Sequence, residues 1–442
     1  MSVVPRLASR LRRVVSLLGG GGRGWALVAI ASGWFLVLGL RFVVPGLLPV
    51  ITDEFPVSNA TAGVAITLLW AAYGAMQFPA GALVDRLGER TLLTASTAGA
   101  ALAMVGFALA PTFGLFLVAT LAFGATSGLF GPPRGTALTR LYDAGDGAAF
   151  GTVLAMGSVG SALLPPLALL FTGVVGWRGA LGLAAPLFVL VAVGLWLAVP
   201  ARGTAAAERA VRARADRGAG PNDGGTASGP GDSGTGADPD ERDETADLRE
   251  RAATVGRAMR SRRVVVAVVG TTLMLFVFQG LTAFFTTYLV EQKNLAESTA
   301  GAVFGLLFLG GAVSQGSGGA LARRYGHGRI LAVVAFTGVL PLAVLPFVGG
   351  LVPVSLVAVL LGVRLSVGPV ANSYVVALLP PAVRGTAWGA IRTAFFTVGA
   401  FGSTVVGAMA DRGLFAEAFL LLAALSALAG VAYLFVPARD AD

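Results

Sequence analysis

The sequence predicts an all-α polytopic membrane protein in which twelve transmembrane helices form two pseudo-symmetric six-helix bundles. Of the 442 residues, 55% are hydrophobic and only 12% are charged, whereas soluble domains usually carry about 25% charged residues. The apolar segments approach or exceed the ~20 residues that a helix needs to cross a hydrocarbon core of ~30 Å. The two halves of the chain also align with each other. Lipid is therefore expected to be the main solvent.

The chain divides into apolar spans at its charges, prolines and glycine-rich turns. Six spans are predicted in the first half, at 25–51, 60–83, 91–110, 113–139, 149–174 and 179–199, and six in the second half, at 264–290, 299–322, 330–349, 353–378, 386–409 and 414–436. The predicted domains are an N-terminal arm (1–24), a first bundle (25–200), a linker (201–262), a second bundle (263–436) and a tail (437–442).

The segment 201–262 is rich in Gly, Asp and Arg. Such a segment buries too little apolar surface to offset its chain entropy, so a flexible linker is predicted. When the helices alternate sides, most Lys and Arg residues fall on the side of this linker, and cationic loops are retained in the cytoplasm. The predicted location is the plasma membrane, with both termini cytoplasmic and membrane lipids as partners.

The two halves are related by an internal repeat. Thr61-Ala62-Gly63 matches Thr299-Ala300-Gly301, and Gln77 matches Gln315, in each case at the same spacing along the chain. Between 61 and 93 this register gives twelve identities, where the composition predicts about three by chance. Two parallel repeats related by an axis along the membrane normal are typical of transporters whose halves rock about a midplane site.

The loop after the second predicted helix carries a motif. It reads Gly81-Ala82-Leu83-Val84-Asp85-Arg86-Leu87-Gly88-Glu89-Arg90, and with it the chain resembles the major facilitator superfamily. The resemblance implies a conformational latch, in which Asp85 meets the start of the eleventh helix near Gly385 and Thr386, with Arg384 as an additional partner. The latch residues are then Gly81, Asp85, Arg86, Gly88, Arg90 and Arg384. The second copy of the motif has Arg323 in place of the aspartate, so a symmetric second latch is not expected.

The fifth predicted span carries Gly151, Gly160 and Pro165. Their spacing resembles the glycine and proline signature of antiporters in the same superfamily. Leucine or alanine stands at other positions where that signature has glycine, so the motif favours export only weakly.

Four arginines lie inside apolar spans, where each cation costs about 2.5–3.5 kcal/mol unless it faces a cavity or a partner. Arg41 and Arg364 lie midway along their helices, and the resemblance implies that helices 1, 4, 7 and 10 line the cavity. Both are therefore candidate anion ligands. Arg134 and Arg392 lie nearer the cytoplasmic ends and are equally able to reach lipid headgroups. Candidate polar neighbours along the path are Gln279, Asn372, Ser373 and Tyr374.

These observations predict a secondary active transporter that moves a small solute, preferably an organic or inorganic anion, by rocker-switch alternating access. A guanidinium group matches carboxylate and phosphate in two-point hydrogen bonding. One alternative is efflux of multiple lipophilic drugs by proton antiport, with H⁺ as the coupling ion; the helix-5 motif and Trp70, Tyr73 and Trp388 support it. A membrane sensor or scaffold that uses the linker is the alternative from another class.

Other classes of function find little support. The chain has no cysteine and a single histidine, His327, and it lacks HExxH, GxSxG and phosphate-binding GKS/T sequences. An enzyme, a cofactor or a metal site is therefore not expected. Nucleic-acid binding is not expected either, because the arginines lie between apolar runs rather than on one basic face. The expected oligomeric state is a monomer.

Overall fold

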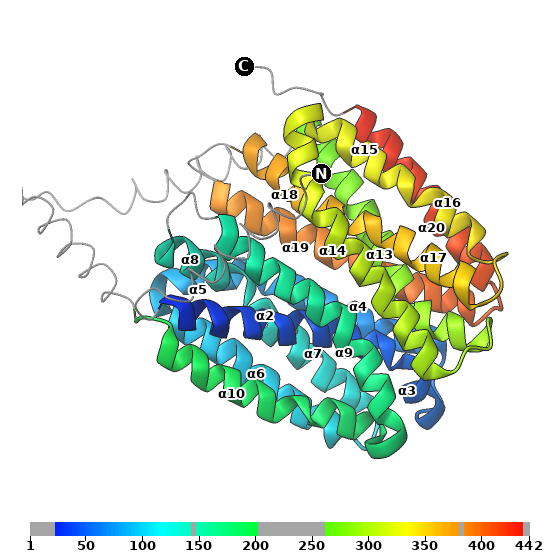
Figure 1. Ribbon diagram of the computed structural model, residues 1–442, viewed down its shortest axis with the longest axis horizontal. Coiled ribbons are helices and arrows are strands. Elements are labelled where there is room, and N and C mark those ends of the chain that lie inside the picture. Colours follow the sequence, from blue (N-terminus) through cyan, green and yellow to red (C-terminus); the bar gives the residue numbers. More distant parts are fainter. Residues whose placement is uncertain (1–22, 143–146, 202–260, 380–383, 436–442) are drawn as a thin grey trace, which may run out of the picture.

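The computed structural model describes residues 23–142, 147–201, 261–379 and 384–435 (Figure 1). Most of the predicted arm, nearly all of the linker and the whole tail lie outside these ranges. Within them the chain is built from helices and short connections. The end of the molecule where the described helices meet the linker residues is called the linker end here, and the opposite end the distal end.

In the first half, each predicted span corresponds to one helix or to a broken helix. In chain order the helices are α2 (Arg23–Gly46), α3 (Leu48–Glu54), α4 (Asn59–Ala75), α5 (Gln77–Leu87), α6 (Glu89–Ala108), α7 (Phe113–Gly128), α8 (Gly131–Leu141), α9 (Gly147–Gly182) and α10 (Ala184–Ala198). Helix α9 runs through a sharp break at Gly176, where φ is 67°. It therefore contains the fifth predicted span and leads directly into the sixth.

The second half repeats this order. Its elements are α13 (Arg262–Glu291), α14 (Glu297–Tyr325), α15 (His327–Thr337), α16 (Val339–Val344), α17 (Leu351–Gly362), the short 3₁₀ helix η1 (Val363–Ser366), α18 (Val367–Leu378), α19 (Arg384–Ala410) and α20 (Phe415–Leu434). The tenth predicted span is thus interrupted by η1, which carries Arg364.

The number of crossings agrees with the prediction. The described residues contain ten helical stretches long and apolar enough to span a membrane, or eleven when the bent pair α4–α5 is counted as one more. One of the ten, Ala148–Ala198, has 51 residues, which would be about 77 Å long as a single helix. It is broken at Gly176 and holds two crossings, so the expected twelve are present.

The internal repeat is visible in the backbone. Gly88 and Gly326, which occupy equivalent positions in the repeat, have φ values of 79° and 92°. Gly176 and Gly413 have φ values of 67° and 72° at the matching distal turns. Residues with a Cβ are strained in this region, whereas glycine is not. The same residue type therefore fixes the same turn in both halves, and the predicted pseudo-symmetric pair of bundles is confirmed.

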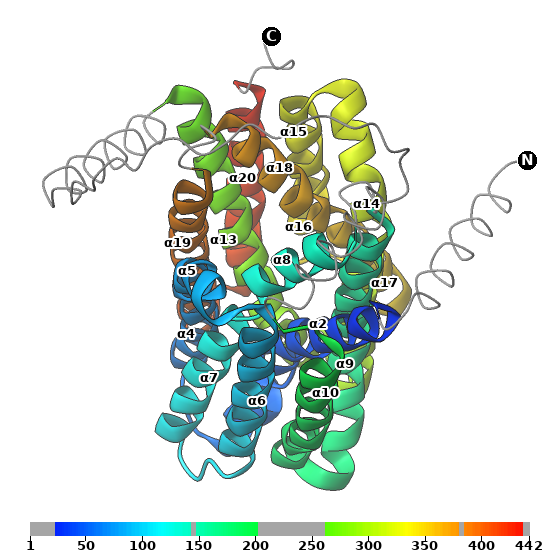
Figure 2. The same cartoon turned by 90° about the vertical axis from the view of Figure 1, so that its left-hand side faces the viewer.

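Close helix packing joins the halves. Helix α4 lies along α19, and α9 lies along α14 (Figures 1 and 2). A Cβ on Gly63 would lie 2.6 Å from the Ser403 carbonyl oxygen, and one on Gly301 would lie 2.6 Å from the Leu169 side chain. Glycine is thus required where backbones approach this closely.

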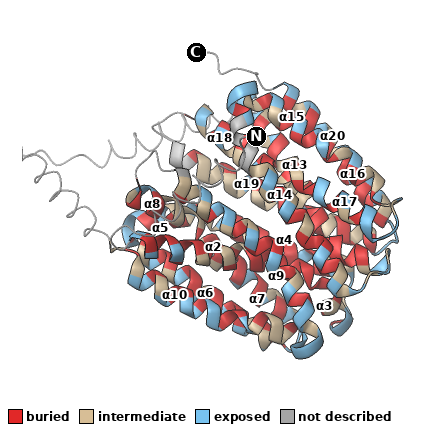
Figure 3. Cartoon of the chain, in the orientation of Figure 1, coloured by how far each residue is buried: buried red, intermediate tan, exposed pale blue. Residues whose placement is uncertain are grey.

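The distal end carries a polar contact between the halves. Asp411, just past the end of α19, accepts hydrogen bonds from the backbone N–H groups of Asn59 (2.6 Å) and Ala60 (2.9 Å) at the start of α4. Buried residues concentrate where helices face one another, and exposed residues lie on the outer faces (Figure 3). These outer faces are apolar, as at Leu102 and Leu190, which suits contact with lipid.

Candidate functional site

Arg41 lies deep within α2 and is almost fully buried, with 1% of its surface exposed. Its Nε atom donates to the Val37 carbonyl oxygen one helical turn back (3.3 Å). The guanidinium carbon lies 4.1 Å from the ring centroid of Tyr73 and 4.9 Å from that of Trp70. The Nη2 atom has no hydrogen-bond partner among the described residues. The cation is therefore held by aromatic faces while part of its donor capacity is unused.

Two further arginines converge on this place. The guanidinium carbon of Arg134, on α8, lies 3.8 Å from the centroid of Trp34, and that of Arg41 lies 5.3 Å from the same ring. The guanidinium carbon of Arg392, on α19, lies 5.7 Å from the ring centroid of Trp388 and also 5.7 Å from that of Phe396. All three arginines are close enough to Tyr73 to interact with it electrostatically. Arg41, Arg134 and Arg392 are called the arginine cluster below.

Aromatic side chains from both halves surround the arginine cluster. The Phe396 ring stacks on Trp70 with centroids 6.0 Å apart and meets Tyr73 edge-on at 5.0 Å. Close approach of the helices makes these contacts possible, because a Cβ on Gly74 would lie 2.6 Å from the Cβ of Phe396. Thr393 also donates to the Gly74 carbonyl oxygen (2.9 Å). The site is thus shared by α2, α4 and α8 of one half and α19 of the other.

The arginine cluster has unmatched positive charge. Besides the Nη2 atom of Arg41, the Nη1 atom of Arg134 and the Nε atom of Arg392 are buried without a hydrogen-bond partner among the described residues. The ion pairs found among the described residues are Arg140–Glu89 and Arg178–Glu54. Neither involves an arginine of the arginine cluster. Buried cations without a counter-ion repel one another. The arrangement is therefore suited to holding an anion.

Arg364 has different surroundings. It is buried inside the second half, and its Nη2 atom lies 3.7 Å from the sulfur of Met274. A Cβ on Gly338 would collide with its Nε atom, so the side chain fills the space above this glycine. Arg364 packs between two helices outside the arginine cluster. Its Nε and Nη1 atoms are also buried without a hydrogen-bond partner among the described residues, so a role in binding an anion stays a prediction for Arg364.

The predicted polar neighbours lie at separate places. Gln279 is fully buried, and neither atom of its amide group has a partner among the described residues. In the register of the repeat it aligns with Arg41, so the two occupy equivalent positions in the halves. Asn372 and Trp388 line the same small space between helices, and Ser373 donates to the Val370 carbonyl oxygen (2.9 Å). The Tyr374 ring lies 5.5 Å from His327 near the linker end.

The latch motif spans the junction of α5 and α6. Gly81 has open space where a Cβ would lie, Asp85 and Arg86 occupy the last turn of α5, and Gly88 makes the turn. Arg90 stacks on Trp196, with the guanidinium carbon 3.8 Å from the ring centroid. Arg384 begins α19, but its side chain and residues 380–383 lie outside the described residues. The predicted contact of Asp85 with this segment therefore stays a prediction.

The helix-5 motif lies along the contact between α9 and α2. A Cβ on Gly160 would collide with the Phe35 carbonyl oxygen, and Pro165 lies against Gly46. Gly151 has open space around its Cα atom. Two of the three motif residues thus serve close packing within the first half.

Sequence reasoning missed Trp34 and Phe396, which frame the arginine cluster. Trp34 precedes Arg41 by seven residues, or about two helical turns, and Phe396 follows Arg392 by four. Both spacings place the aromatic ring on the same helix face as the arginine. Both residues could therefore have been found in the sequence as aromatic residues one or two helical turns from a buried arginine.

The family to which the chain belongs follows from comparison with known proteins. A family model described as Major Facilitator Superfamily matches residues 30–402. The chain belongs to this superfamily. Among curated protein sequences, no significant match was found. The family and the fold together identify a multi-pass membrane protein that acts in secondary transport of small molecules.

Solved structures of transporters share the fold of this superfamily member. A bacterial homologue of the human lysosomal transporter Spinster, in an inward-facing and occupied conformation, is 16% identical with a TM-score of 0.72, covering 94% of this chain and 96% of that one. The unoccupied inward-facing form of that homologue is 17% identical with a TM-score of 0.68, covering 96% and 100%. A mutant of the nucleoside transporter NupG is 14% identical with a TM-score of 0.72, covering 93% and 99%.

Proposed function

We propose that this transporter carries a small anion, organic or inorganic, and that the arginine cluster binds it. The observation that supports this most strongly is the convergence of three arginines with unused N–H donors at one aromatic-lined place. A carboxylate or phosphate accepts two parallel hydrogen bonds from one guanidinium group. Because α19 belongs to the second half, a bound anion would bridge the halves, as a substrate must in alternating access.

The proposed orientation places the linker end in the cytoplasm of a cell bounded by the plasma membrane. Among the described residues, most Lys and Arg residues lie at the linker end. Those at the distal end are Arg178, Lys293 and Arg412. Cationic loops are retained in the cytoplasm. Both termini would then be cytoplasmic, and the contact between Asp411 and the start of α4 would help to close the outer face.

Efflux of lipophilic compounds by proton antiport is the second candidate. The rings of Trp34, Trp70, Tyr73 and Phe396 around the arginine cluster favour it, because aromatic faces bind planar apolar molecules. Proton coupling usually relies on a carboxylate at membrane depth. The carboxylates of the described residues lie near helix ends, so the first candidate is preferred.

Flux through proteoliposomes tests the proposal. Thermal-shift screening of purified protein against carboxylates, phosphates and lipophilic cations selects a ligand, whose counterflow is then measured. Arg41→Gln and Arg392→Gln should lower anion flux at least about tenfold, since a charged hydrogen bond contributes about 1.5–3 kcal/mol. The matched control is Arg412→Gln, an exposed arginine at the distal end. Anion flux that survives both cluster substitutions, or flux of lipophilic cations alone, would contradict anion binding.

Deleting most of 203–245 separates a transporter from a sensor or scaffold. A transporter should keep its flux, because this part of the linker only connects the halves. Loss of flux in a variant that is still folded and inserted would count against it.

A further inference from the structure

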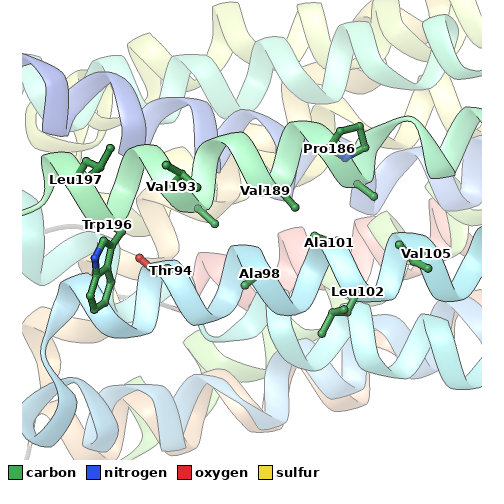
Figure 4. Close-up of a pocket in the computed structure, with 12 residues that line it drawn as sticks. Thr94, Ala98, Ala101, Leu102, Val105, Pro186, Val189, Val193, Trp196 and Leu197 are labelled. Carbon is green, nitrogen blue, oxygen red and sulfur yellow. The ribbon is translucent and has the colours of Figure 1, made fainter.

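An apolar groove runs along the outer face of the first half, between α6 and α10 (Figure 4). Its volume is about 550 Å³. Small side chains on α6, including Ala98 and Ala101, form one wall, and Val189 and Val193 on α10 form the other. It lies on a surface that faces the hydrocarbon core in a spanning bundle. The groove is therefore filled from the membrane rather than from water.

The groove has a polar end. At the linker end Trp196 and Thr94 lie near each other (Figure 4), and the guanidinium of Arg90 stacks on Trp196 at 3.8 Å. The Nε atom of Arg90 and the hydroxyl oxygen of Thr94 are both buried without a hydrogen-bond partner among the described residues. The Arg90 guanidinium group thus lies beside a tryptophan at one end of the apolar groove, where the lipid headgroups would be.

The length of the groove matches one leaflet. On α6 it runs from Thr94 to Val105, which at 1.5 Å per residue is about 17 Å. Half of the hydrocarbon core measures about 15 Å. An extended acyl chain whose headgroup is held at Arg90 would therefore end near the middle of the bilayer.

At the matching place in the second half, an aromatic ring lies between the two helices. Phe336 stands where the first half has Ala98, and a Cβ on Gly430 of α20 would lie 2.8 Å from its ring, so the ring fills the gap between α15 and α20. Gly328 replaces Arg90, and Ala332 replaces Thr94. The small wall residue, the cation and the hydroxyl group that mark the groove in the first half are thus all replaced at the aligned positions of the second half.

We propose that this groove binds a phospholipid with an anionic headgroup, its acyl chain along α6 and α10 and its phosphate at Arg90. Unspecific lipid covers every outward face, but here a half-buried guanidinium group, held against Trp196, lies at the end of a groove about as long as one acyl chain. Arginine pairs with phosphate in two-point geometry, and its stacking on Trp196 fixes the guanidinium plane. This proposal does not depend on which solute is transported.

Native mass spectrometry of the full chain tests it, with phosphatidylglycerol and phosphatidylcholine as probes. Wild-type protein should retain phosphatidylglycerol preferentially. Arg90→Gln should weaken this retention about tenfold by removing a charged hydrogen bond, and Ala98→Phe should abolish it by filling the groove with the side chain of the other half. The matched controls are Arg329→Gln, an exposed arginine in the first turn of α15, and Ala95→Phe, on α6 outside the groove lining.

Both controls should retain phosphatidylglycerol as the wild type does. Equal retention of the two lipids by the wild type, or unchanged retention in Arg90→Gln, would overturn the proposal. If Ala98→Phe does not fold, Arg90→Gln alone decides, because Arg90 lies outside the groove lining and its substitution leaves the groove open.

Discussion

The two halves share one scaffold but differ in where they carry charge. Equivalent glycines make equivalent turns, as at Gly88 and Gly326. At the position equivalent to Arg41, however, the second half has Gln279, which is just as deeply buried. The backbone of each half is thus fixed by glycines, which tolerate a positive φ and close helix contacts. The charge at the candidate site is set by single side chains, which can differ between the halves without changing the backbone. In this protein the first half supplies most of the charged and aromatic groups of the candidate site.

The largest expected effect comes from exchanging the equivalent residues. Arg41→Gln gives the first half the residue of the second, and anion flux should fall about ten- to hundredfold, because a charged hydrogen bond is lost. Adding Gln279→Arg to the same chain should not restore flux, because the rings of Trp70 and Tyr73 that hold the cation lie beside position 41. Counterflow in proteoliposomes measures both. Recovery in the double variant would mean that the two positions are interchangeable.

The second test concerns the buried arginine of the other half. Gly338→Ala places a Cβ against the Arg364 side chain and should lower the free energy of unfolding by about 1–3 kcal/mol, the usual cost of overpacking. Arg364→Met should relieve that loss in the double variant, because methionine is flexible and bears no charge.

Unfolding in mixed detergent micelles measures these differences in stability. On its own, Arg364→Met should leave anion flux within about twofold of wild type, since Arg364 lies outside the arginine cluster. Loss of flux in a stable Arg364→Met variant would show that Arg364 serves transport as well as Arg41, as the position of both midway along apolar spans first suggested.

A smaller effect is expected from the ring shared by two cluster arginines. Trp34→Leu removes the aromatic face beneath Arg134 and beside Arg41. A desolvated cation–π contact contributes about 0.5–2 kcal/mol, so the dissociation constant for the anion should rise about two- to thirtyfold. Isothermal titration in detergent measures it. Val191→Leu, a conservative change on α10 beside Gly33, serves as the control and should bind normally.

The smallest effect is a pH dependence at the distal turn of the first half. Hydrogen bonds from Arg178 and then from Trp177 hold the pKa of the Glu54 carboxyl below its usual value. A lowered pKa in the folded state means that the stabilisation is complete above the unfolded pKa, about 4.3 for Glu, and is lost as the pH falls through the folded value. The side chain is 45% exposed, so the gain is below about 1 kcal/mol.

Comparing wild type with Glu54→Gln by thermal unfolding checks this sign. The variant should be less stable at pH 7, and the difference should shrink below pH 4. The second half has Phe415 where the first has Arg178, so the same ion pair does not form there. A difference that stays constant with pH would rule out ionisation of Glu54 as its cause.

Much of the fold could be predicted because lipid imposes simple rules on a chain. Each span must be apolar for ~20 residues, and charges and glycines mark its ends, as at Gly88. The interruptions inside spans were not predicted. The break before Gly131 and the turn of 3₁₀ helix at Arg364 depend on how a helix packs against its neighbours, which no local pattern records.

The candidate site was predictable only in part. The depth of Arg41 follows from its place in an apolar span, but its proximity to Arg392 depends on how α4 packs along α19. That packing rests on glycines such as Gly74, whose partners Thr393 and Phe396 lie in the other half of the chain. Residue type and depth thus identified candidates, whereas the grouping of those candidates required the three-dimensional structure.

The contact of Asp411 with the start of α4 has a consequence for the kinetics of the transport cycle. Opening the distal face must draw this carboxylate away from a helix N-terminus, whose partial positive charge contributes about 0.3–1 kcal/mol at low ionic strength. Asp411 is exposed, so dissolved salt screens the attraction. The opening step should therefore run faster in concentrated electrolyte than in dilute solution, and turnover would reflect the salinity of the compartment on that side.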